Sequence, residues 1–253
     1  MTEQMRGKVA LVTGGSSGIG RASALAFVRE GAKVVVCDVN TEGGEETVRM
    51  INEARGEGIF VHADVSKAAD VEAMVNKTVE VYGRLDYGFN NAGILAGGGP
   101  LHESSEENWD RIISINLKGV WLCMKYEIAQ MLKQGGGAIV NTASLAGLVG
   151  ERGNPIYAAS KHGVVGVTRS AALQYAKDGI RINAVCPGFI HTAMIDPIIA
   201  GRSDLEAALN ARHPMGRMGT PNEVAEAVVW LCSDAASFVT GHAMSVDGGY
   251  VAQ

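Results

Sequence analysis

Three side chains in one short stretch, Ser144, Tyr157 and Lys161, could together move a proton to or from a carbonyl oxygen. A phenol has a pKa near ~10, which is too high for easy proton exchange at neutral pH. An ammonium group about 4 Å away, at an effective dielectric constant near 20, favours the phenolate by roughly 4 kcal/mol and brings its pKa near 7. We therefore expect Lys161 to lower the pKa of Tyr157, and Ser144 to hold the substrate oxygen within its reach. Alone, Tyr-x-x-x-Lys is more typical of an ordinary pair on a helix surface, so the interpretation depends on the rest of the chain.

A strand and a helix must position these groups. The apolar run 138–140 is long enough for a buried strand, so Ser144 lies where that strand would end. Asn154 can cap the following helix, and Pro155 suits its first position, where a missing N–H needs no partner. Residues four apart on that helix lie on one face, which places the phenol above the ammonium.

A glycine-rich turn near the N-terminus predicts an anion site. The apolar strand 8–12 is followed by Gly14, Gly18 and Gly20 and then by a helix that Gly31 can end. Bare backbone in such a turn lets a pyrophosphate approach the amides at the helix N-terminus. The spacing is Gly-x3-Gly-x-Gly, which differs from the Gly-x-Gly-x-x-Gly pattern and could alone be a plain turn.

Asp38 favours NAD over NADP. It ends the second strand, 33–37, and lies 18 residues beyond Gly20. A carboxylate there can accept hydrogen bonds from both ribose hydroxyls, and would repel a 2′-phosphate by roughly 1–4 kcal/mol at about 4 Å. The adjoining Ser17 and Val39 offer no compensating positive charge. The alternative is a surface aspartate at a strand end.

Taken in order, these features resemble the short-chain dehydrogenase/reductase family of roughly 250-residue proteins, over essentially the whole chain. The matching motifs are Thr13–Gly20, Asn90–Gly93, Asn116, Ser144, Tyr157–Lys161 and Pro187–Gly188. The resemblance implies one Rossmann-type domain over residues 1–253, with a doubly wound parallel sheet of about seven strands and helices on both faces. It also implies a catalytic tetrad of Asn116, Ser144, Tyr157 and Lys161, with a substrate lid at about 189–215.

The resemblance assigns further roles to single residues. Asn116 would help hold a water that connects Lys161 to solvent, although its amide could instead hold a helix bend between about 108 and 132. Asp64 would lie beside the adenine amine, or could cap the next helix. Ile190 and Thr192 would meet the nicotinamide carboxamide. The residues expected to bind the cofactor are Gly14, Ser16, Ser17, Gly18, Ile19, Gly20, Asp38, Val39, Asp64, Val65, Asn91, Ala92, Gly93, Tyr157, Lys161, Pro187, Gly188, Ile190 and Thr192.

The sequence thus predicts an NAD(H)-dependent oxidoreductase that interconverts a secondary alcohol and a ketone. The expected substrate contacts are mostly apolar, which favours a fairly hydrophobic or cyclic molecule: Leu95, Ser144, Leu145, Ala146, Val149, Tyr157 and Met194. A sugar dehydrogenase of the glucose type and a 3-oxoacyl thioester reductase remain alternatives, although Gly135 and Asp178 occupy positions where the latter usually has basic residues. A non-catalytic NAD-binding regulatory protein is a distant alternative.

Composition excludes several other classes. The net charge of −5 argues against nucleic acid or an anionic membrane as partners, and no apolar run reaches the ~18 residues of a membrane span. The four cysteines show no paired or metal-like spacing, which is typical of reduced thiols in a cytoplasmic protein. We expect no metal site, although some members of the family bind a structural cation near the C-terminus. His191 and His213 lie in the lid region and could touch the substrate, but we expect them to be solvated. The resemblance also implies a homodimer or homotetramer, paired through the helices around Asn116 and Tyr157.

Overall fold

A seven-stranded parallel sheet with the order β3-β2-β1-β4-β5-β6-β7 lies at the centre of the protein. The computed structural model describes residues 4–95 and 98–253. The strand order reverses between β1 and β4, and this is where open α/β sheets bind their ligands. The strands are β1 (Val9–Thr13), β2 (Lys33–Asp38), β3 (Gly58–His62), β4 (Tyr87–Asn90), β5 (Gly137–Thr142), β6 (Ile180–Pro187) and β7 (Ala243–Val246).

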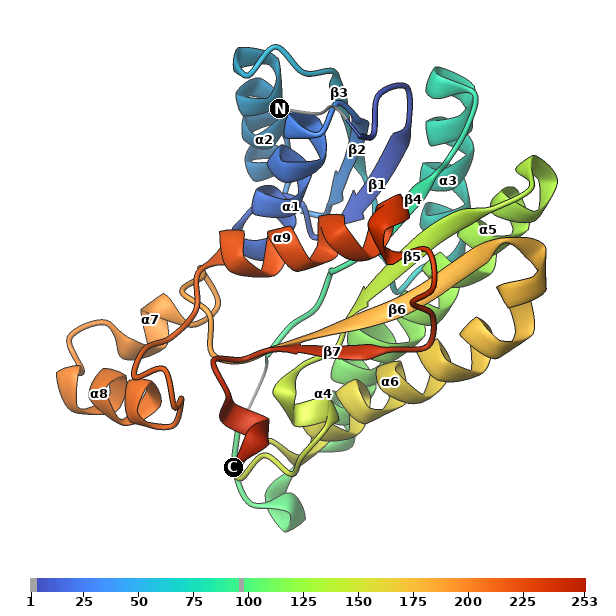
Figure 1. The fold of residues 1–253 in the computed structure, drawn as a ribbon. Helices are drawn as coiled ribbons and strands as arrows, with labels where there is room; N and C mark the ends of the chain where they lie inside the picture. Colours follow the sequence, from blue (N-terminus) through green and yellow to red (C-terminus); the bar gives the residue numbers. More distant parts are fainter. Residues whose placement is uncertain (1–3, 96–97) are drawn as a thin grey trace.

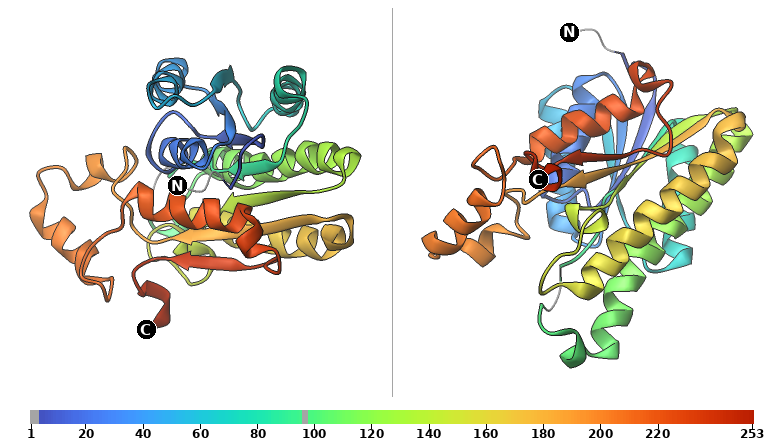
Figure 2. Two further views of the ribbon diagram at one scale, coloured as in Figure 1. Left: turned by 45° about the horizontal axis from the view of Figure 1, so that its top comes forward. Right: turned by 60° about the horizontal axis from the view of Figure 1, so that its bottom comes forward.

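Helices cover both faces of the sheet (Figures 1 and 2). One face carries α1 (Gly18–Arg29), α2 (Thr41–Glu53) and α9 (Pro221–Cys232); the other carries α3 (Ala68–Tyr82), α5 (Gly119–Gln134) and α6 (Pro155–Tyr175). Neighbouring residues of β1 accordingly enter different cores: Val12 packs with Phe27 on the first face, and Leu11 packs with Met74 on the second. The doubly wound fold predicted from the sequence is confirmed.

Local signals account for several helix ends. Gly83, at the left-handed φ of 76°, ends α3, and Gly31 follows the end of α1 with φ 88°. At the start of α9, Thr220 and Glu223 form the reciprocal capping box that their spacing indicates. Asn154 does occupy the N-cap position of α6, with Pro155 next, but its side chain makes no capping hydrogen bond.

The single helix expected between about 108 and 132 is instead interrupted. α4 (Glu106–Ile113) passes through a π-helical turn, Ser114–Lys118, into α5. The buried Asn116 lies in this turn, and its side-chain amide pairs with both backbone groups of Ile94, at 2.8 Å each. The amide therefore joins the turn to the segment that follows β4, as the helix-bend alternative required.

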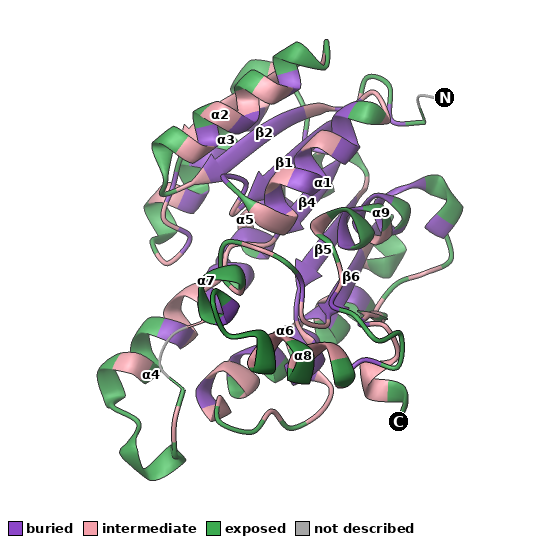
Figure 3. Cartoon of the chain, turned by 90° about the vertical axis from the view of Figure 1, so that its left-hand side faces the viewer, coloured by how far each residue is buried: buried purple, intermediate pink, exposed green. Residues whose placement is uncertain are grey.

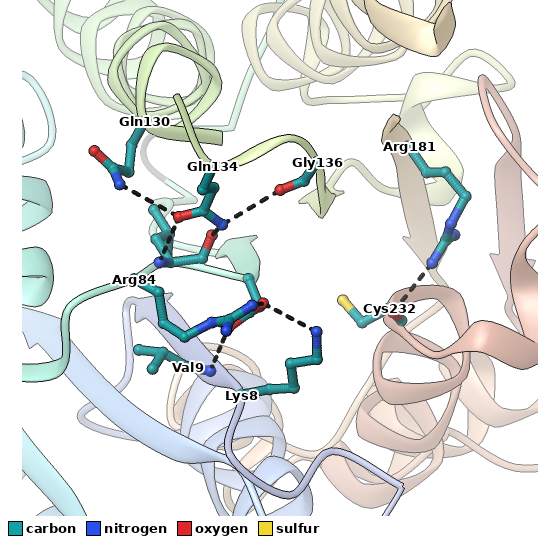
Figure 4. Close-up of polar contacts among 10 residues, drawn as sticks. Lys8, Val9, Arg84, Gln130, Gln134, Gly136, Arg181 and Cys232 are labelled. Carbon is teal, nitrogen blue, oxygen red and sulfur yellow. Dashed lines mark hydrogen bonds and ion pairs between the residues drawn. The ribbon is translucent and has the colours of Figure 1, made fainter. Parts of the chain in front are cut away.

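The amino-terminal edge of the sheet is held by a separate set of polar contacts (Figure 4). The Gln134 amide pairs with both backbone groups of Leu85, at 3.1 and 2.6 Å. The carboxylate of the buried Asp86 accepts from the Val9 amide at 3.0 Å and pairs with Lys8 at 3.3 Å. These contacts tie β1, the start of β4 and the end of α5 together, far along the strands from their carboxyl ends.

Two short helices, α7 (Asp196–Ile199) and α8 (Ser203–Ala211), project beyond the carboxyl ends of the strands (Figure 1). Every residue of α8 is at least partly exposed (Figure 3). Both helices lie within the segment 189–215, whose role as a substrate lid stays a prediction. None of the helices in the described part of the chain is long and apolar enough to cross a membrane.

Candidate active site

A cavity of about 450 Å³ opens along the carboxyl ends of β1, β2, β4, β5 and β6. One end is lined by the glycine turn and by Asp38, and the other by Tyr157 and an apolar wall that includes Leu95 and Met194. The predicted dinucleotide site and the predicted proton-transfer groups therefore share one continuous space.

The glycine turn fits a closely approaching phosphate group. Gly14 and Gly18 have φ values of +64° and +51°, which residues other than glycine rarely adopt. A Cβ at Gly20 would lie only 2.0 Å from the Gly14 carbonyl oxygen, so the turn requires a bare backbone there. Asn91 supports the turn from β4, because its side-chain amide donates to the carbonyls of Thr13 and Gly14 at 3.2 Å each.

Asp38 lies beside this turn. Its carboxylate accepts hydrogen bonds from the Ser16 amide at 3.0 Å and the Asn40 amide at 2.9 Å. The two bonds fix a negative charge at the cavity wall, where the sequence places the ribose hydroxyls of the cofactor. Asp64, the next acid along this end, accepts from Ser66 instead of capping α3, whose N-cap is Lys67. The capping alternative for Asp64 is therefore not observed.

Tyr157 and Lys161 lie one turn apart on α6, as predicted. The buried ammonium donates to the Thr142 carbonyl at 2.8 Å and lies 5.6 Å from the centre of the Tyr157 ring. Burial lowers the pKa of Lys161 to about 8. Burial also raises the pKa of Tyr157, against the opposing effect of a hydrogen bond with Ser144. This direction is opposite to the one expected from the sequence, because removal of the phenol from water, together with a smaller effect of the Glu151 carboxylate, outweighs the hydrogen bond with Ser144.

Ser144 and Asn116 complete the predicted tetrad from other elements. Ser144 follows β5 and lines the cavity with Tyr157. Asn116 lies behind the wall: a Cβ on Gly93 would be 3.3 Å from its Oδ1 atom and 3.6 Å from Lys161 Nζ. The structure therefore groups Asn116, Gly93 and Lys161, with Asn116 outside the cavity lining. Whether Asn116 also holds a water stays a prediction.

Nearly all the predicted binding residues line the cavity. Three residues do not: Gly20 lies beneath the turn, Asn116 lies behind the wall, and Val149 lies outside the lining. The lining residues that sequence reasoning did not place in the site include Glu151, Asn154, Thr142, Ala143 and Phe189. The position of Asn154 at a helix start could have indicated proximity, whereas nothing local distinguishes Glu151.

The remaining expectations for titratable side chains have mixed outcomes. All four cysteines are buried and free. Within residues 4–95 and 98–253, no cluster of three or more potential metal ligands is found. His191 is exposed and pairs with Asp196 at 3.0 Å. The expectation that His213 is solvated is wrong, because it is buried between the Leu209 carbonyl and the Phe189 amide, at 2.9 and 3.2 Å.

The family model described as enoyl-(acyl carrier protein) reductase matches residues 14–251. The chain belongs to the short-chain dehydrogenase/reductase family. The matched model describes a reductase, so the cavity with Tyr157 at one end and the glycine turn at the other is that of an oxidoreductase.

Individual members resemble the chain over its full length. A 2,5-dichloro-2,5-cyclohexadiene-1,4-diol dehydrogenase of Sphingobium indicum is 46% identical over 98% of each chain. A cis-4-hydroxycyclohexanecarboxylate dehydrogenase of Sinomonas cyclohexanicum is 44% identical over 100% of each chain. The crystal structure of a levodione reductase, 41% identical, superposes with a TM-score of 0.95 over 98% of this chain and 99% of its own.

Proposed function

We propose that the protein is an NAD(H)-dependent oxidoreductase that interconverts a cyclic secondary alcohol and the corresponding ketone. The observation that carries this proposal is the single cavity in which Ser144, Tyr157 and an apolar wall face the same space as the glycine turn. A bound nicotinamide dinucleotide would supply or accept the hydride, and the chain's own residues would handle the proton and the substrate oxygen.

The proton transfer is assigned to Tyr157. In the direction of reduction its hydroxyl donates a proton to the carbonyl oxygen, and in oxidation the phenolate takes the proton back. Ser144 donates a hydrogen bond that keeps the same oxygen next to the phenol. Lys161, fixed by the Thr142 carbonyl, places a positive charge beneath the ring, which stabilises the phenolate when it forms. Asn116 positions the Gly93 segment against Lys161.

The preference for NAD rests on Asp38. Its carboxylate is held in place by two backbone amides at the end of the cavity that includes Val39. A 2′-phosphate brought to this wall would meet a fixed negative charge, whereas ribose hydroxyls would find an acceptor. For the remaining cofactor contacts we propose the residues expected from the sequence.

The substrate class rests on the apolar wall and on the relatives. The catalytic end is lined by Ile94, Leu95, Leu145, Met194 and Ile195, which suit a compact hydrocarbon ring. The two dehydrogenases named above act on six-membered rings according to their names. Their substrates differ in charge, since one name includes a carboxylate and the other does not.

Self-association as a homodimer or homotetramer is also proposed. Trp109 of α4 and Trp121 of α5 are each 46% exposed near the π-helical turn, and pairing of these helices between subunits would cover them. Sedimentation at micromolar concentration tests this: a monomer would contradict it. A cytoplasmic location stays a prediction.

The central experiment follows NADH and NADPH absorbance with a panel of ketones and alcohols. The panel contains cyclohexanone, 1,4-cyclohexanedione, an aryl ketone, glucose and a ketoacyl thioester, each with both cofactors. We expect the highest kcat/KM with a cyclic ketone and NADH. Faster turnover of glucose or of the thioester would replace the proposed substrate class, and absence of turnover with every compound would contradict the proposed reaction.

A further inference from the structure

Glu151 brings a carboxylate to the otherwise apolar, catalytic end of the cavity. Among the described residues that line this space, the other carboxylates are those of Asp38 and Asp64. Both lie at the opposite end of the cavity, which the glycine turn also lines. Glu151 belongs to the loop before α6, and only 10% of its side chain is exposed. Its neighbour in the lining is Asn154, whose side chain is not used as a helix cap.

The partner of this carboxylate comes from a distant part of the chain. Arg212, just after α8, approaches Glu151 at 3.3 Å. Its guanidinium packs against the rings of Phe189 and Tyr250, at 5.3 and 5.1 Å from their centres, and donates to the Tyr250 hydroxyl. The Tyr250 hydroxyl lies 3.5 Å from the other carboxylate oxygen. The segment after β6, the end of α8 and the C-terminal turn thus converge on one acidic side chain.

The two charges of this pair do not face the cavity equally. Glu151 lines the cavity, whereas Arg212 does not and leaves 41% of its side chain exposed. A substrate at the catalytic end therefore meets the negative end of the pair first, with the positive end behind it. Charges interact more strongly in such a poorly solvated site than in water.

We propose that Glu151 makes the enzyme selective for the charge of its ring substrate, so that it accepts neutral and cationic alcohols and disfavours those with a carboxylate. This inference rests on the proposed function and narrows its substrate class. A carboxylate on the far side of the ring would approach the Glu151 oxygens and would reach Arg212 only past them. An ammonium in the same position would gain a partner.

The test first establishes that the enzyme oxidises cyclohexanol. It then compares kcat/KM for three ring alcohols of similar size at pH 7. The probes are cis-4-methylcyclohexanol, cis-4-aminocyclohexanol and cis-4-hydroxycyclohexanecarboxylate, and the neutral probe is the reference. In the unmodified enzyme we expect a higher kcat/KM for the amine than for the carboxylate. Glu151→Gln should lower this ratio at least about tenfold, equivalent to about 1.4 kcal/mol.

A second variant separates charge from shape. Arg212→Gln leaves the Glu151 carboxylate without its partner, so it should move the amine-to-carboxylate ratio in the opposite direction. A purely structural effect on the segment around α8 would move both variants the same way, and that result would overturn the proposal. Glu226→Gln is the matched control, because Glu226 also pairs with an arginine, Arg29 at 2.6 Å, but does not line the cavity. This variant should leave the ratio unchanged.

Three further outcomes are informative. If a variant fails to fold, inhibition of the unmodified enzyme by cyclohexanecarboxylate and by cyclohexylamine still tests the inference, and stronger inhibition by the carboxylate would contradict it. If none of the ring alcohols and ketones is turned over with either cofactor, the proposed function fails. If they are turned over and the ratio does not respond to Glu151→Gln, only the charge selectivity fails.

Discussion

Replacing the buried Glu127 by glutamine should make the protein more stable at alkaline pH. Glu127 lies on α5 and is fully buried against the sheet, where Gly88 leaves room for its carboxyl group. Asn90 donates one hydrogen bond to Oε2 of Glu127 at 2.9 Å, and Oε1 of Glu127 has no hydrogen-bond partner. Burial therefore raises the pKa of Glu127 from 4.5 to about 7.

The sign and size of the effect follow from the difference between the pKa of Glu127 in the folded protein, about 7, and its ordinary value of 4.5 in the unfolded chain. Between pH 4.5 and about 7 the folded protein binds more protons at this site than the unfolded chain, so stability falls as the pH rises. The contribution is fully present below pH 4.5 and is lost as the pH passes through 7. At 1.36 kcal/mol for each pKa unit, the full loss is about 3 kcal/mol. Glutamine keeps the shape of the side chain without a charge, so its stability should lack this pH dependence.

Urea unfolding followed by circular dichroism at pH 5 and pH 8 measures the effect. The stability of Glu127→Gln minus that of the unmodified protein should increase by roughly 2–3 kcal/mol between the two pH values. This difference cancels the titration of other groups, and equal protein concentrations keep any association comparable. Glu226→Gln provides the control, because the pKa of Glu226 is lowered by Arg29 and its contribution changes only at more acidic pH. A Glu127→Gln difference that stays constant from pH 5 to pH 8 would refute the reasoning.

Three other substitutions test the site. Tyr157→Phe should reduce kcat roughly 10²- to 10⁴-fold while NADH binding, measured by fluorescence, is retained; near-normal turnover would remove the assigned proton donor. Asp38→Asn should raise kcat/KM with NADP relative to NAD by about tenfold, since the repulsion it removes is roughly 1–4 kcal/mol, and an unchanged ratio would show that Asp38 does not select the cofactor. Gly20→Ala should abolish cofactor binding, because its Cβ would lie 2.0 Å from the Gly14 carbonyl, whereas Gly150→Ala meets no atom within 4 Å and should bind normally. Normal NADH affinity in Gly20→Ala, measured by titration calorimetry, would contradict the need for bare backbone at this position.

Features that depend on neighbouring residues were predictable from the sequence. The apolar runs predicted β1, β2 and β5 within two residues, since a strand buried on both faces is apolar along its length. The capping box at Thr220 and the glycine turn at Gly14–Gly20 are likewise local patterns. The family resemblance predicted a doubly wound parallel sheet of about seven strands, which is confirmed.

Features that depend on distant contacts were not predictable in this way. The effect of Lys161 on Tyr157 depends on how strongly burial competes with charge, and a spacing of four residues contains no information on burial. The π-helical turn at Asn116 depends on the backbone of Ile94, a partner outside its own helix. The position of the Glu151 carboxylate similarly depends on its contact with Arg212, which lies 61 residues further along the chain.

The polar contacts drawn in Figure 4 lie at the amino-terminal ends of the strands, whereas the cavity is lined by residues at the carboxyl ends of the same sheet. Gln134 and Asp86 take part in these polar contacts, and neither residue lines the cavity. Directed evolution could therefore improve thermal tolerance through residues at the amino-terminal ends of the strands and, separately, broaden the substrate range through residues that line the cavity. A library that combines the two kinds of change should lose fewer active members than one confined to the cavity.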